Sequence, residues 1–195
     1  MGRILFLVQL PPPVHGVTMM NNNLINSKIL QANFCFDIVN LRFIKSIDEI
    51  SKYSIRKVFK AIGYGYEIIK KLLKNKPDLV YFTISPKGYA FFRDSLYVCI
   101  LKTFRKKIVY HLHGKGIKES SRRNFIIKVI STWIFRNSYV ICLSDRLVND
   151  IDWIYKSIPF VVRNGIEVQS DSLERKSHVK DSVPNILYLS NYARD

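Results

Sequence analysis

The order of apolar segments constrains the fold of this chain more than any other feature. Short apolar runs alternate with longer amphipathic stretches about six times between residues 4 and 163. The run 4–8 is apolar at every position, as expected of a strand buried on both faces of a parallel sheet. Such alternation indicates stacked βαβ units. We therefore predict an α/β fold with a Rossmann-like, doubly wound parallel sheet and helices on both faces.

The pattern also places the individual elements. Expected strands cover residues 4–8, 34–41, 79–83, 107–113, 139–143 and 160–163, and expected helices cover 17–31, 55–74, 88–104, 118–136 and 145–156. In open α/β sheets, ligands bind beyond the carboxyl ends of the strands. Functional residues are therefore expected in loops 9–17, 84–88, 113–118 and 144–146.

A change in composition suggests the domain organisation. Residues 1–166 are predicted to form one N-terminal Rossmann-like domain. Residues 167–184 are polar and lack periodicity, so they are interpreted as a linker, and residues 185–195 begin a new apolar strand. Since one strand cannot make a domain, that strand is expected to open a second domain.

The charge is strongly unbalanced, with 31 Lys and Arg against 15 Asp and Glu and a formal net charge of +16. This favours a polyanionic partner, either nucleic acid or an anionic membrane. A basic proteome, or an acidic domain elsewhere, is the alternative explanation. No RRM, KH or helix-turn-helix signature supports nucleic-acid binding.

Two segments, 45–76 and 102–136, carry most of the excess charge. In the second, cations interleave with apolar residues and Trp133, a composition that suits a helix lying at a membrane interface. The alternative is that these apolar residues simply face the core. The two basic segments favour a cytoplasmic protein that is peripheral on the inner face of the cell membrane. No uncharged run approaches the ~18 residues that span a bilayer.

The cysteines point to the same compartment. Cys35, Cys99 and Cys142 each lie in an apolar run, so all three are expected to be buried. An odd number of buried thiols suggests a reducing cytosol.

The loop 9–16 joins the first expected strand to the first expected helix. Gly16 allows close approach of the backbone, and the helix start directs free N–H groups and the positive end of its dipole outward, which suits a phosphate. Neither a G-x-G-x-x-G fingerprint nor a P-loop is present. A rigid strand-to-helix turn explains the loop about as well.

A second motif joins His111, His113 and two glycines, Gly114 and Gly116. The period of a strand places both histidines on one face, and His113 falls at the carboxyl end, where the glycines leave room for a ligand. A two-histidine metal site lacks a third ligand nearby, so no metal is expected. A structural role remains open, more for His111 than for His113. The third motif, Asn164-Gly165, is by itself a turn signal.

Taken in order, these motifs resemble the N-terminal half of family 4 glycosyltransferases, which are retaining GT-B enzymes. The matching segments are 4–7, 11–16, 76–81, 111–114, 139–144, 162–166 and 185–191. Arg163 stands where the family usually has proline. The resemblance implies a chain that ends where the donor-binding half begins.

The resemblance also implies roles. His113 would be the catalytic residue, hydrogen-bonding a sugar hydroxyl between donor and acceptor, and the other substrate-binding residues would be His15, Gly16, His111, Gly114, Asn164 and Gly165. The co-substrate would be a nucleotide sugar and the acceptor a glycan or a lipid-linked sugar, with no cofactor or metal. Alone, this chain is expected to be inactive. The alternatives are a basic nucleic-acid-binding α/β domain and a non-catalytic domain from a truncated gene.

Overall fold

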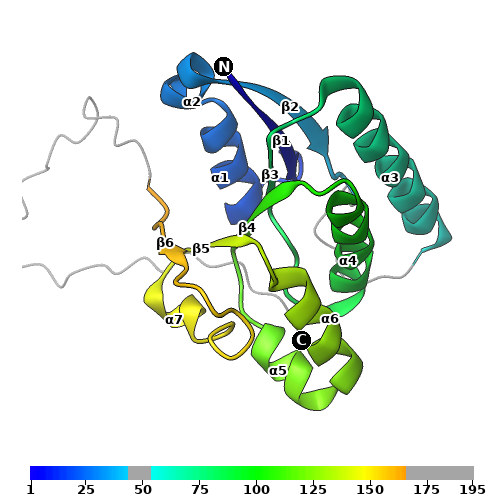
Figure 1. Ribbon diagram of the computed structural model, residues 1–195, viewed down its shortest axis with the longest axis vertical. Helices are drawn as coiled ribbons and strands as arrows, with labels where there is room; N and C mark the ends of the chain where they lie inside the picture. The colour runs from blue at the N-terminus through cyan, green and yellow to red at the C-terminus, as the bar shows by residue number, and fades with distance from the viewer. Residues whose placement is uncertain (44–53, 166–195) are drawn as a thin grey trace, which may run out of the picture. The chain divides into compact units, whose positions relative to one another are not determined.

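The computed structural model describes residues 1–43 and 54–165, and its compact unit spans Met1–Asn164. Six strands form one sheet in the order β2-β1-β3-β4-β5-β6, and every neighbouring pair is parallel (Figure 1). The strands are β1 (Gly2–Val8), β2 (Phe34–Asn40), β3 (Leu79–Phe82), β4 (Lys107–Leu112), β5 (Tyr139–Cys142) and β6 (Phe160–Val161). The predicted Rossmann-like parallel sheet is confirmed.

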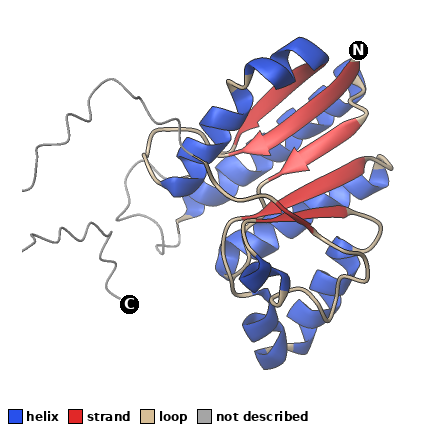
Figure 2. Cartoon of the chain, turned by 90° about the vertical axis from the view of Figure 1, so that its left-hand side faces the viewer, coloured by secondary structure: helices blue, strands red, loops and turns tan. Residues whose placement is uncertain are grey.

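Helices cover both faces of this sheet (Figure 2). They are α1 (Gly16–Ile25), α2 (Lys28–Asn33), α3 (Ile55–Asn75), α4 (Gly88–Thr103), α5 (Ile117–Arg123), α6 (Phe125–Phe135) and α7 (Asp145–Val148). The chain steps from β1 to β2 in one direction and from β3 to β6 in the other. Because such crossovers are right-handed, α1 packs on one face while α3, α4 and α6 pack on the other.

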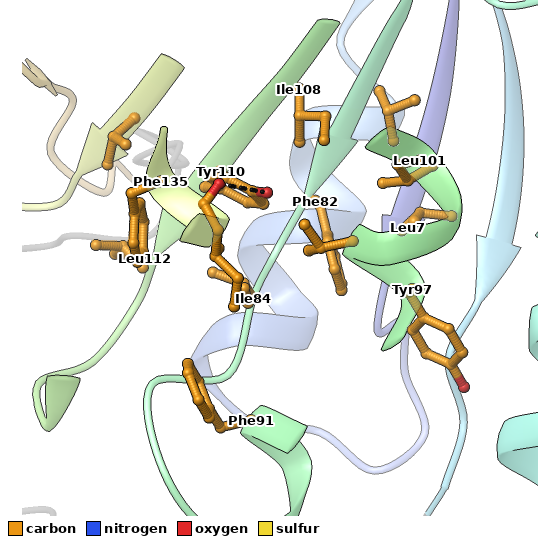
Figure 3. Close-up of a cluster of buried hydrophobic side chains, with 14 of the residues drawn as sticks. Leu7, Phe82, Ile84, Phe91, Tyr97, Leu101, Ile108, Tyr110, Leu112 and Phe135 are labelled. Carbon is orange, nitrogen blue, oxygen red and sulfur yellow. Dashed lines mark hydrogen bonds between the residues drawn. The ribbon is translucent and has the colours of Figure 1, made fainter. Parts of the chain in front are cut away.

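The larger hydrophobic core lies between the sheet and the layer of α3, α4 and α6 (Figure 3). Tyr110 is fully buried there, stacks edge-on against Phe135 and donates its hydroxyl hydrogen to the Ile134 carbonyl at 3.2 Å. Successive residues of a strand face opposite sides. His111, next to Tyr110, therefore faces the α1 side of the sheet.

Three expected helices are shorter than predicted. The expected helix 17–31 is divided into α1 and α2, and the expected helix 118–136 is divided at Asn124. There the Asn124 side chain accepts hydrogen bonds from the Ile126 and Ile127 amides and caps a new helix. The expected helix 145–156 ends as α7 at Val148, and tight turns with bonds from Asp150 N–H to Leu147 O and from Ile151 N–H to Val148 O follow.

The expected burial of all three thiols is wrong for two of them. Cys35 and Cys99 are exposed, and Cys142 is buried. Cys35 lies on β2, an edge strand, and Cys99 lies on the solvent side of α4, so an apolar run did not mean full burial at either position. The expected linker and the expected strand at 185–195 lie outside the described residues.

Candidate functional site

The carboxyl edge of the sheet brings the predicted loops together. β1 lies between β2 and β3, so the connections that leave β1 and β3 run in opposite directions, and this is where open α/β sheets bind ligands. Gly16 follows β1 and His113 follows β4, with β3 between those two strands. Because all strands are parallel, both residues lie at the same edge. A cleft shared by them stays a prediction.

Three aromatic side chains form an array at this edge, which we call the Tyr81–His111–His113 array. The Tyr81 hydroxyl and His111 Nδ1 are hydrogen-bonded. The His111 and His113 ring centroids lie 4.2 Å apart, with the rings tilted by 41°. Both Nε2 atoms are buried and have no hydrogen-bond partner within residues 1–43 and 54–165. The structure therefore brings together the two histidines that the sequence singled out and adds Tyr81 from β3.

The array is uncharged at neutral pH. Burial, helped by the adjacent His113, lowers the pKa of His111 to about 3, and burial lowers the pKa of His113 to about 4. Burial also raises the pKa of Tyr81, so its phenol keeps its proton beside His111 Nδ1. In the tautomer that accepts this proton at Nδ1, the proton of the neutral His111 ring lies on Nε2. Imidazoles with such low pKa values are neutral and weakly basic at pH 7, so their chemistry is to orient a polar ligand.

The loop that carries Gly114 is held by Asp150, a residue that sequence analysis missed. The Asp150 carboxylate accepts hydrogen bonds from the backbone N–H groups of Gly116 and Ile117 at 3.0 Å and of Lys118 at 3.2 Å. Asp150 is only 8% exposed. The available signal was a pair of acidic residues, Asp150 and Asp152, among the apolar residues of segment 147–155. The start of α5 is thus occupied by the protein's own carboxylate and is not open to a phosphate.

A second buried carboxylate fixes the loop after β3. Asp94 is fully buried, accepts a hydrogen bond from the Ser85 N–H at 2.9 Å, and is paired with the guanidinium of Arg93 at 2.6 Å. That guanidinium also lies 3.9 Å from the centre of the Phe43 ring. Burial raises the pKa of Asp94, and the charge of Arg93 opposes this rise. Asp94 therefore anchors the loop after β3 through the Ser85 amide.

The loop before α1 is organised by Thr18. Its hydroxyl accepts a hydrogen bond from the His15 N–H at 3.0 Å and donates to the Pro13 carbonyl at 2.9 Å. A Cβ atom added at Gly16 would meet nothing within 4 Å, and Gly16 does not have a positive φ. Nothing in the described chain therefore requires glycine at position 16. That Gly16 allows a ligand to approach the backbone closely stays a prediction. Burial lowers the pKa of His15.

Asn164 and Gly165 are less favourably placed to belong to the same site as His113. They follow β6, which is separated from β4 by β5. Asn164 is exposed, and Gly165 belongs to the second unit of the chain, which begins at that residue. Their assignment to the site stays a prediction.

The two glycines beside His113 differ in what the backbone demands. Gly116 has φ +139°, and a Cβ atom there would lie 3.1 Å from Lys87 Cδ, whereas a Cβ atom at Gly114 would make an ordinary 3.7 Å contact with Pro86. Gly116→Ala should lower the free energy of unfolding by about 1–3 kcal/mol. Gly114→Ala should change it by less than about 0.5 kcal/mol. Urea denaturation measures both, and equal losses would contradict this assignment.

A basic pocket lies at the opposite edge of the sheet. Its volume is about 490 Å³, and it surrounds the start of β4 and the ends of α4 and α6, lined by Lys102, Arg105, Lys106, Lys107, Ile108, Trp133, Arg136 and Asn137. Sequence analysis noted its cations but did not bring them together. Because these residues lie at the amino edge, the pocket is separate from the histidine array.

Metal-binding residues do not gather in the described part of the chain. Within it, no group of three or more His, Cys, Asp or Glu side chains is arranged to hold an ion. Among the described residues, His111 and His113 therefore have no third His, Cys, Asp or Glu side chain beside them that could complete a metal site. A function without metal stays a prediction.

The chain was compared with family models, curated proteins and solved structures. No family model matches the chain. No curated protein matches it either. Among solved structures it is similar to MurG of Acinetobacter baumannii, with a TM-score of 0.40 and 10% sequence identity. The similarity covers 83% of this chain and 45% of that one, so the chain spans less than half the length of this neighbour.

Proposed function

We propose that the described domain forms the acceptor side of a glycosyltransferase active site and that His113 orients a sugar hydroxyl there. The observation that carries the proposal is the Tyr81–His111–His113 array, with its two unpartnered Nε2 atoms at the carboxyl edge of the sheet. The ordered sequence motifs that resemble retaining GT-B enzymes support the same function.

The array is chemically suited to a sugar. A buried polar atom without a partner costs about 1–3 kcal/mol, and a ligand hydroxyl recovers this by donating and accepting hydrogen bonds. His111 offers a donor at Nε2, and His113 offers one donor and one acceptor as a neutral ring. A phosphate would prefer cations or free amides. The start of α1 at Gly16 is the better place for one, because the start of α5 is taken by Asp150.

In this proposal, the histidines contribute positioning. Holding an acceptor hydroxyl in line with the sugar carbon lowers the entropic part of the barrier. The charge that develops on the departing diphosphate must be stabilised by other donors. The resemblance assigns the nucleotide contacts to a second domain, so the role proposed for the described domain is to bind and orient the acceptor. The donor would be a nucleotide sugar and the acceptor a glycan or lipid-linked saccharide.

Calorimetric titration with acceptor analogues tests the proposal. The probes are geranyl diphosphates that carry single hexoses or N-acetylhexosamines, short enough to remain in solution. His113→Ala should weaken the best ligand about 10-fold, since it removes one buried hydrogen bond worth about 1.4 kcal/mol. His113→Gln, which keeps a neutral donor and acceptor, should lose less. Equal affinity of the wild type and both variants would refute the role of His113.

The rival function is nucleic-acid binding, which the net charge of +16 and the basic pocket favour. Such binding would weaken steeply with salt, because neutralised phosphates release counterions. Filter binding with DNA and RNA oligonucleotides across a salt series separates the two functions. Tight, salt-dependent binding of oligonucleotides, without response to any saccharide, would favour the rival.

A further inference from the structure

Helix α3 has an apolar stripe that the core does not use. Ile55, Phe59, Ile62, Tyr66 and Leu73 follow one another at spacings of three, four or seven residues, which places them on one side of the helix. Each is 60–70% exposed. A different side of α3, with Ile68 and Leu72, packs into the core. Core packing therefore does not explain the stripe.

Two further helices, α4 and α6, also carry exposed apolar side chains. α3 packs against α4, where the Tyr97 hydroxyl donates to the Ala61 carbonyl at 3.0 Å, and α4 packs against α6 (Figure 1). All three lie on the same face of the sheet. We define the apolar helical face by their exposed side chains: Ile55, Phe59, Ile62, Tyr66, Leu73, Phe92, Leu96, Phe125, Ile126, Val129 and Trp133.

Core packing explains only part of the apolar composition of α6. Ile127, Ile130, Ile134 and Phe135 pack on or into the core. Phe125 and Ile126 are 75% and 62% exposed, and Val129 and Trp133 are also exposed. The sequence left open whether this helix meets the core or a membrane. In the structure, one side of it meets the core and another side remains at the surface.

Cations border this face. α3 carries six Lys or Arg residues and one Glu. On α6, Trp133 of the apolar helical face also lines the basic pocket. The residues that line this pocket include five cations and no acidic residue. Lys102 and Lys106 donate to backbone carbonyls, whereas Arg105, Lys107 and Arg136 make no ion pair within the described residues. Burial, and to a lesser extent the charge of Arg136, lowers the pKa of Lys102, and a bound anion would oppose this shift.

We propose that the apolar helical face lies flat on an anionic membrane, with lipid phosphates held by the cations at its border. A single partner helix would cover one stripe, whereas the exposed apolar residues extend across three adjacent helices. A second copy would bring its own cations against these cations, which is unfavourable. Cations near an anionic bilayer contribute about 1 kcal/mol each. Within the described residues, no helix combines the length and the apolar composition needed to cross a bilayer. The inference does not rest on the proposed function.

Sedimentation with lipid vesicles tests the inference on the full chain. Binding is expected to vesicles of phosphatidylcholine mixed with phosphatidylglycerol, to weaken with salt, and to be much lower with phosphatidylcholine alone. Phe59→Gln combined with Ile62→Gln should reduce partitioning at least about 10-fold through lost apolar burial. Arg56→Glu combined with Lys74→Glu and Arg136→Glu should reduce it at least about 100-fold.

Matched controls use exposed residues outside the face. Ile29→Gln with Ile158→Gln changes two exposed apolar side chains, and Lys28→Glu with Arg146→Glu and Lys156→Glu changes three exposed cations. Neither control should change binding by more than about 2-fold, since neither set belongs to the face. Equal binding to neutral vesicles, or equal losses in the controls, would overturn the inference. So would absence of vesicle binding, whether or not the chain associates with itself or with an acidic protein.

Discussion

Replacing Asp150 with alanine should lower the free energy of unfolding by about 3–4 kcal/mol. The Asp150 carboxylate accepts hydrogen bonds from three consecutive backbone N–H groups, at Gly116, Ile117 and Lys118. Without it, these donors at the start of α5 lose their charged acceptor in a place that water reaches poorly. The loop next to His113 would also lose its anchor. Equilibrium unfolding in urea measures the effect.

Asp152, two residues away, provides the control. Its carboxylate pairs with Lys118 at 3.1 Å, and its side chain is 47% exposed. A surface pair of this kind contributes at most about 1 kcal/mol. Asp152→Ala should therefore be nearly neutral, and Asp150→Asn should fall between the two alanine variants, because one oxygen still accepts. If Asp150→Ala costs no more than Asp152→Ala, the anchoring role is wrong.

Acid should destabilise the domain through the histidine array. His111 and His113 have folded-state pKa values of about 3 and about 4, below the ordinary value of 6.5 for histidine. Below pH 6.5 the unfolded chain therefore binds protons that the folded chain does not. Their stabilising contribution is full above pH 6.5 and falls as pH drops toward the folded pKa values. For each ring that stays neutral in the folded state, the free energy of unfolding falls by up to about 1.4 kcal/mol per pH unit below pH 6.5.

The two rings are partly exposed, so solvent screening reduces this sum. We expect a loss of about 3 kcal/mol between pH 7 and pH 4.5 from the pair. Urea unfolding at both pH values gives the total change, to which carboxylates also contribute. The double variant His111→Gln, His113→Gln removes the histidine part. It should lose about 3 kcal/mol less than the wild type over this range. The same loss in both proteins would show that the rings are not held neutral.

The strands could be predicted because a strand that is buried on both faces of a sheet is apolar at nearly every position. Residues 4–8 of β1 are apolar at every position, and no helix period fits so short a segment. The helix breaks were harder. The division at Asn124 depends on one side chain that accepts hydrogen bonds from the Ile126 and Ile127 amides, and a helix-like apolar pattern continues across it. Periodicity reports which side is apolar and says nothing about a local competitor for backbone hydrogen bonds.

The candidate site was predictable in part for the same reason. A period of two sufficed to place His111 and His113 on one face of β4. Tyr81 was not found, because its contact with His111 depends on the register between β3 and β4, where Tyr81 pairs with Val109. Asp150 lies 34 residues from Gly116, a separation that no local pattern connects. The low pKa values of the histidines likewise arise from burial that only the assembled sheet creates.

The measurement that tests the central claim most directly is nitrogen NMR of histidine-labelled protein during titration with the geranyl diphosphate saccharides. In the free chain, His111 should show a bare Nδ1 and a protonated Nε2 at neutral pH, and His113 should also be a neutral ring. Adding the ligand that binds best should shift the Nε2 signals of His111 and His113, since these atoms gain hydrogen-bond partners. A ligand that saturates the protein and leaves both signals in place would contradict the account.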